Sequence, residues 1–141
     1  GHRVVSNPSA SWLMHYRRKV TASAQTVDLA GLATYPAKLQ ARLWATWTHG
    51  AFSNTLTLRH TSRLKDPVGA RVDDQTTADL QIAFAVPAKT GPWKGLNLAL
   101  TVQNLFDQDP PFYDSRVGAG YDPANYDPFG RVVALQLTKA W

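Results

Sequence analysis

The feature that most constrains this chain is a period of two in its apolar residues, which recurs in six separate segments. From residue 38 to 48, for example, Leu39, Leu43 and Trp47 alternate with Gln40 and Thr46. Successive side chains of a β-strand point to opposite faces, so this pattern predicts strands with one apolar face. The segments predicted as strands span residues 9–19, 38–48, 52–63, 76–86, 95–106 and 131–141. No segment has a convincing helical period, and the chain is predicted to be all-β.

The second face of each predicted strand carries small, amide and hydroxyl side chains. A soluble sheet usually presents a face rich in Lys and Glu to water. Among 141 residues this chain has no glutamate, and its charged fraction is 18%, below the usual quarter or so. We therefore expect the second face to line an enclosed interior and the apolar face to meet lipid.

The connections between the predicted strands alternate between short and long. Residues 49–51 form a tight turn and residues 87–94 a short linker, whereas residues 20–37, 64–75 and 107–130 are long loops. In an antiparallel up-and-down meander all long loops lie at one end, as in outer-membrane barrels with short periplasmic turns and long extracellular loops. Strands of about 10 to 12 residues, tilted by about 45°, also cover the ~25 Å apolar band of such a barrel.

The aromatic residues predict where the membrane surface lies. Five of them are expected at strand ends beside the short connections, where they would form a girdle among lipid headgroups. These are Trp12, Trp47, Phe52, Trp93 and Trp141, while Tyr16 and Phe106 are expected toward the opposite end. At any single position, a tryptophan that fills a soluble core is the alternative interpretation.

Six strands are too few to close a membrane barrel, for which about eight is the smallest number. An open edge in lipid would leave backbone groups unpaired, at several kcal/mol each. We therefore expect the chain to be a C-terminal piece of a larger barrel, with further strands and any export signal before Gly1. No apolar run reaches the 18 residues of a membrane-spanning helix, which excludes a helical membrane protein.

The last third of the sequence carries a series of specific motifs between residues 95 and 141. The motif residues are Asn104, Leu105, Phe106, Asp107, Asp109, Pro110, Pro111, Phe112, Gly120, Tyr121, Asp122, Pro123, Asp127, Pro128, Gly130 and Arg131. A final predicted strand with an aromatic end follows and contains Val133, Leu135, Leu137 and Trp141. These motifs resemble the C-terminal end of TonB-dependent outer-membrane receptors, and the last four residues resemble the signal read by the barrel-assembly machinery. The resemblance spans most of residues 9–141.

This resemblance implies a 22-stranded barrel in the bacterial outer membrane, with its C-terminus on the periplasmic side. It implies energy-coupled uptake of a scarce nutrient: siderophore-bound iron, haem, cobalamin or a glycan. The expected partners are outer-membrane lipid, the barrel-assembly machinery, an unidentified small-molecule ligand and, in the full-length protein, TonB and a plug domain. The plug and the TonB-contacting segment are absent from this chain.

The long segment before the last predicted strand is expected to be a string of turns. Pro110 and Pro111 cannot donate to a β ladder, and Asp-Pro pairs favour turns. Its aromatic residues can pack on one another or face a ligand. As candidate ligand contacts we take Tyr113, Arg116, Tyr121 and Tyr126.

No other chemistry has a convincing pattern in the sequence. The loop carboxylates Asp107, Asp109, Asp114, Asp122 and Asp127 lack calcium-loop spacing and are expected to cap turns. The histidines lack metal-binding spacing, with His15 expected to face the barrel interior, and no cysteine is present. We expect no enzyme activity, cofactor or metal.

The charged residues leave two further expectations. Net charge is +5, but the basic residues are scattered, so we expect no nucleic-acid partner. Arg17, Arg42, Arg59 and Asp79 fall on the interior face by parity and would need partners there. The alternative to a receptor fragment is a soluble β-sandwich or small-barrel binding module.

Overall fold

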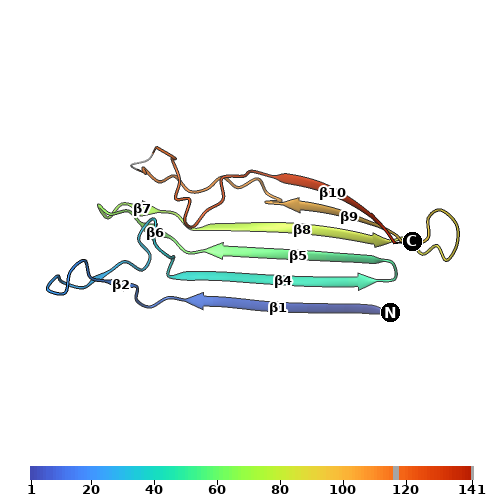
Figure 1. The fold of residues 1–141 in the computed structure, drawn as a ribbon, viewed down its shortest axis with the longest axis horizontal. Helices are drawn as coiled ribbons and strands as arrows, with labels where there is room; N and C mark the ends of the chain where they lie inside the picture. Colours follow the sequence, from blue (N-terminus) through green and yellow to red (C-terminus); the bar gives the residue numbers. More distant parts are fainter. Residues whose placement is uncertain (116–117, 141) are drawn as a thin grey trace.

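Six long strands form one antiparallel sheet in the computed structural model, which describes residues 1–115 and 118–140 (Figure 1). The strands, in spatial order, are β1 (His2–Trp12), β4 (Leu39–His49), β5 (Phe52–Thr61), β8 (Gln75–Ala85), β9 (Leu96–Gln103) and β10 (Val132–Lys139). Each of these six strands pairs with the long strand that precedes or follows it in the sequence. This confirms the predicted all-β antiparallel meander. The sheet is open, with β1 and β10 at its edges.

The strand register separates two faces. Leu56 lies opposite Leu80, and Ile82 lies opposite Leu100, which in turn lies opposite Leu135. The apolar face comprises Leu43, Trp47, Leu56, Leu58, Leu80, Ile82, Phe84, Leu98, Leu100, Leu135 and Leu137. The polar face comprises Arg42, Thr46, Thr55, Thr57, Arg59, Thr77, Asp79, Gln81, Thr101, Gln103 and Gln136. The predicted alternation is therefore confirmed from β4 to β10.

The long connections all lie at one end of the sheet and the short ones at the other (Figure 1). At the long-loop end two small hairpins extend the chain: β2 (Arg17–Arg18) with β3 (Val27–Asp28), and β6 (Leu64–Lys65) with β7 (Arg71–Val72). The opposite end holds the β4–β5 turn and the β8–β9 connection. This is the arrangement that the loop lengths predict.

The hydrophobic cluster of the molecule lies among the long loops instead of on the sheet. Its buried members are Ala33, Ala37, Leu64, Val72, Tyr113 and Tyr126. On the apolar face, by contrast, Leu135 is 73% exposed and Leu137 is 64% exposed. Across the described residues no second sheet packs on the apolar face. A soluble sandwich would bury such a face between two sheets.

The first strand differs from its predicted bounds of 9–19. β1 spans His2–Trp12, and Arg17 and Arg18 pair with β3 instead of continuing the sheet. Pro8 lies inside β1, opposite Leu43. An edge strand tolerates proline because half of its backbone groups need no strand partner. Proline and small polar residues therefore hid the strand in the sequence, and the predicted interior positions of His15 and Arg17 were wrong.

The predicted girdle of aromatic residues is only partly matched by the structure. Trp12 ends β1 opposite Leu39, so it lies at the long-loop end and not in the predicted girdle beside the short connections. The position follows directly from the shifted strand. Trp47 and Phe52 flank the β4–β5 turn and Trp93 lies in the β8–β9 connection, as predicted. Trp141 lies outside the described residues.

The remaining strand ends differ by only a few residues from the prediction. β9 ends at Gln103 instead of residue 106, because Asn104 takes a positive φ of 49° and leaves the extended conformation. β5 ends at Thr61, and β10 spans Val132–Lys139. Throughout the described part of the chain, the structure contains no helix long and apolar enough to cross a membrane.

Gly95 provides a test of how β9 and β10 meet. It has a φ of 70°, and an added Cβ would overlap the carbonyl oxygen of Ala140, whose amide donates to Gly95 O at 2.9 Å. Gly91 has a φ of 82° but open space around its Cα. Both alanine variants should lose roughly 1–2 kcal/mol from the left-handed backbone. Gly95→Ala should additionally expose the amides of β10 to hydrogen exchange. Equal hydrogen exchange of the β10 amides in Gly91→Ala and Gly95→Ala would contradict the close approach of Gly95 to Ala140.

Candidate functional site

The three long connections pack together into one body, which we call the loop cap (residues 13–38, 62–74, 104–115 and 118–131). Each connection contributes two members of the buried cluster: Ala33 and Ala37 from the first, Leu64 and Val72 from the second, Tyr113 and Tyr126 from the third. Tyr121 packs against the cluster from outside. Apolar contact therefore joins loops that are distant in the sequence.

Backbone hydrogen bonds join the first and second connections. The amide of Ala33 donates to Lys65 O at 2.7 Å, and the amide of Lys65 donates to Gly31 O at 2.9 Å. Leu32 and Lys65 thus form a parallel bridge. The bridge places Ala33 beside Leu64 of β6, which is fully buried.

Asp122 joins the third connection to the first. Its side chain is fully buried and accepts hydrogen bonds from the amides of Thr34 at 2.9 Å and Ala124 at 3.0 Å, and from Asn125 Nδ2 at 2.8 Å. A buried carboxylate is stable only when such donors replace water. Asn125 Nδ2 also donates to Tyr35 O, while its Oδ1 accepts from the amide of Ala37. The motif residue Asp122 therefore holds the third connection against the first inside the loop cap.

Tyr126 joins the third connection to the second. Its hydroxyl donates to Asp73 O at 3.1 Å. Burial raises the pKa of Tyr126 to about 12, with smaller contributions from the carboxylates of Asp122, Asp74 and Asp73. The phenol therefore remains a hydrogen-bond donor throughout the neutral range.

The predicted ligand contacts are mostly inside the cap. Tyr113 and Tyr126 are buried, and Tyr121 is half-buried against them. Arg116 lies outside the described residues. The structure brings the three tyrosines together, and their contacts with one another are those expected from packing of the loop on itself.

Asn104 and Asp107 close the base of the third connection. Both have positive φ, 49° and 55°, and the Asp107 amide donates to Asn104 O at 2.9 Å. The Asn104 side chain bonds both backbone groups of Gln108, and Asp107 Oδ1 accepts from the amide of Arg131 at 2.6 Å. An added Cβ at Gly130 would lie 2.8 Å from that oxygen and would force the Asp107 carboxylate to shift.

The remaining motif residues differ in burial. Leu105, Pro110, Pro111 and Gly120 are half-buried, whereas Phe106, Asp109, Phe112, Pro123, Asp127, Pro128 and Arg131 are exposed. In the proposed assembly signal, Val133, Leu135 and Leu137 alternate along the exposed apolar face of β10. Its fourth member, Trp141, is beyond the described part of the chain.

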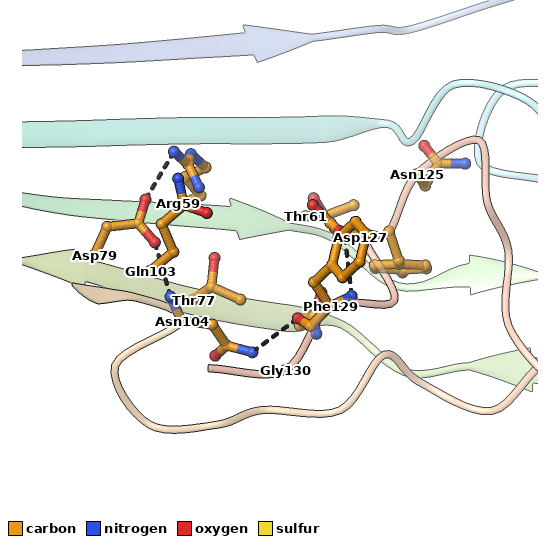
Figure 2. Close-up of a pocket in the computed structure, with 12 residues that line it drawn as sticks. Arg59, Thr61, Thr77, Asp79, Gln103, Asn104, Asn125, Asp127, Phe129 and Gly130 are labelled. Carbon is orange, nitrogen blue, oxygen red and sulfur yellow. Dashed lines mark hydrogen bonds and ion pairs between the residues drawn. The ribbon is translucent and has the colours of Figure 1, made fainter. Parts of the chain in front are cut away.

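A cavity of about 160 Å³ lies between the polar face of the sheet and the end of the third connection (Figure 2). The sheet contributes Arg59, Thr61, Gln75, Thr77, Asp79 and Gln103, and the connection contributes Asn104, Asn125, Tyr126, Asp127, Phe129 and Gly130. The sequence did not single out this group, because its members come from four separate segments between Arg59 and Gly130 and meet only when the third connection folds back over the sheet.

An ion pair forms one wall of the cavity. Arg59 Nη2 lies 2.7 Å from Asp79 Oδ2, and Asp79 Oδ1 accepts from the amide of Asn104 at 3.0 Å. Two of the charged residues expected on the interior face therefore neutralise each other. Arg42 lies directly opposite Arg59 on β4 and is exposed.

A second charged group lies in the first connection. Asp28 Oδ2 is 2.7 Å from His15 Nδ1, and Asp28 Oδ1 accepts from the amides of Tyr16 and Ala30 at 2.9 and 3.1 Å. These hydrogen bonds, the one to His15 first, hold the pKa of Asp28 well below its usual range. No group of three or more His, Asp or Glu suited to a metal occurs in the described residues.

No protein-family model matches the sequence, and neither the curated proteins nor the solved structures compared with it give a match. What the chain does must therefore be inferred from its own residues and geometry.

Removing the Asp122 carboxylate should loosen the loop cap. Asp122→Ala leaves the buried amide of Thr34 and its neighbours without an acceptor, which should cost about 2–4 kcal/mol. Amide exchange at Thr34 and Ala37 should accelerate together. Asp114→Ala, which changes an exposed carboxylate of the same connection, should leave both rates unchanged. Unaltered amide exchange in Asp122→Ala would show that the Asp122 carboxylate does not hold the two connections together.

The first connection should respond to acid through Asp28. Because folding lowers this pKa, the stabilisation is complete above the unfolded value of about 3.9 and disappears as pH falls through the lower folded value. NMR shifts of the Tyr16 and Ala30 amides should therefore show an acid transition below about pH 4. Asp28→Asn should abolish that acid transition, and Asp109→Asn should retain it. A transition that persists in Asp28→Asn would assign it to another group.

Proposed function

We propose that the chain is the C-terminal part of the β-barrel of a TonB-dependent outer-membrane receptor, which takes up a scarce nutrient such as siderophore-bound iron, haem, cobalamin or a glycan. The observation that carries this proposal is the exposed apolar face beside a face of amides and hydroxyls. Water is a poor environment for the first face, and lipid is a poor environment for the second. A barrel wall satisfies both.

The exposed leucines supply the driving force for this placement. Moving a fully exposed leucine side chain from water into hydrocarbon yields roughly 1.5–3 kcal/mol, and a partly exposed one yields proportionately less. Leu43, Leu56, Leu100, Leu135 and Leu137 are all exposed on the apolar face. Their combined transfer outweighs the cost of burying the few polar groups on that face, such as Asn54.

The two open edges support a larger assembly. β1 and β10 each pair on one side only, and unpaired backbone groups cost several kcal/mol apiece in lipid. In the proposed receptor, further strands pair with both edges, as the 22-stranded barrels of the resembling family imply. Closure also encloses the polar face.

The loop asymmetry supports an orientation. In outer-membrane barrels the long loops are extracellular and the short turns periplasmic. The loop cap would then face the outside of the cell, and Trp47, Phe52 and Trp93 would lie near the periplasmic surface. The end of β10 would be periplasmic as well.

Adjacent residues of β10 on opposite faces offer a matched test. Leu135→Arg places a charge on the proposed lipid face and should weaken partitioning into phospholipid vesicles by about 2–4 kcal/mol. Gln136→Arg places the same charge on the polar face and should partition like the parent. Vesicle flotation with tryptophan fluorescence measures both.

Two outcomes would contradict the proposal. One is a parent chain that stays monomeric in detergent-free buffer and does not partition into vesicles, as a soluble binding module would. The other is equal loss of partitioning in Leu135→Arg and Gln136→Arg, which would mean that the two faces do not differ in environment.

A further inference from the structure

We infer that the cavity under the third connection is a subsite for one ring of a neutral, polyhydroxylated ligand of the sugar class. The inference rests on the proposed function in one respect, since it selects the glycan among the nutrients named above. It concerns the twelve residues that line the cavity in Figure 2, all within the described part of the chain.

The charges around the cavity favour a neutral ligand. Arg59 is already paired with Asp79, and Asp79 is further stabilised by the amide of Asn104. Asp127 adds a second carboxylate to the lining, but it is exposed to water, which screens its charge, and its Oδ1 already accepts a hydrogen bond from the amide of Phe129. A ligand with net charge would meet no buried, uncompensated opposite charge here, and burying it would carry a desolvation cost without a matching attraction.

The free hydrogen-bonding groups favour hydroxyls. Thr61, Thr77 and Gln103 line the cavity and make no side-chain hydrogen bond to any other described residue. Hydroxyl and amide groups both donate and accept. A polyol has the same property at every carbon, so its hydroxyls can pair with either end of each side chain. The unpaired N–H groups of Arg59 add donors without adding net charge.

An aromatic ring lies beside these polar groups. Phe129 is 70% exposed although it lines the cavity. In Figure 2, Phe129 and Thr61 lie at one end of the group, and Arg59, Asp79 and Gln103 at the other. A sugar ring has an apolar C–H face and a polar hydroxyl edge, so it suits a site in which a ring and hydrogen-bonding groups are combined.

The size of the cavity limits what it can hold. Pockets for whole ligands are usually roughly 300–1,000 Å³. At about 160 Å³ this cavity is smaller, and it accommodates one unit of a longer molecule. Other parts of the receptor would bind the remaining units.

Titration of the chain in detergent micelles with methyl β-D-glucopyranoside and methyl β-D-galactopyranoside, followed by saturation-transfer NMR, tests the inference. At least one glycoside should bind, and Gln103→Ala and Phe129→Ala should each weaken its binding at least about fivefold. The matched controls are Gln136→Ala, another amide of the polar face, and Phe112→Ala, another exposed ring of the same connection. Both should bind like the parent.

Charged probes distinguish the alternatives. Binding of citrate or tetramethylammonium at the cavity, with no glycoside binding, would overturn the neutral-ligand inference. Equal losses in Gln103→Ala and Gln136→Ala would also overturn it, because the binding would not depend on the cavity. The variant spectra without ligand show whether each cap is folded.

The same experiment separates the two proposals. A chain that inserts into vesicles but binds neither glycoside refutes the subsite and leaves the receptor proposal in place. A chain that binds a glycoside through Gln103 and Phe129 while remaining monomeric without detergent supports the subsite and refutes the receptor.

Discussion

The structure depends on the separation of apolar and polar side chains to opposite faces of a single sheet. Leu80, Ile82 and Leu100 stand on one face while Asp79, Gln81 and Thr101 stand on the other. Within the described residues no second sheet packs on the apolar face, and the third connection folds over part of the polar face only, so the sheet has no hydrophobic core between two layers. Its stability requires an environment that differs on its two sides, and a lipid-embedded barrel wall is the environment we propose.

The loop cap provides the packing that the sheet lacks. Three connections share a cluster of small apolar residues and tyrosines, and Asp122 and Asn125 satisfy backbone groups that the cluster would otherwise leave buried. Irregular backbone usually stays on the surface because its polar groups need water. Here side-chain acceptors replace that water, so a long connection can fold back over the polar face and form the cavity.

Period-two patterning was sufficient to predict five of the six strands and both faces, because alternation is a local signal. It failed at β1, where Pro8 and short polar residues are tolerated at a sheet edge, and that error displaced Trp12, His15 and Arg17. The cavity could not be predicted. Arg59 and Phe129 line the same cavity because the third connection folds back over the sheet. That fold depends on buried hydrogen bonds that join Asp122 and Asn125 to the first connection, and no local pattern encodes such contacts.

Because the sequence contains no cysteine, single cysteines can report the environment of each face without interference. The most direct measurement is spin labelling of Leu100→Cys and Thr101→Cys in phospholipid bilayers, with collision rates toward oxygen and a water-soluble nickel chelate. The label at 100 should collide mainly with oxygen, which dissolves in lipid, and the label at 101 mainly with the chelate. Equal exposure of both labels to the chelate would contradict a lipid-facing apolar surface.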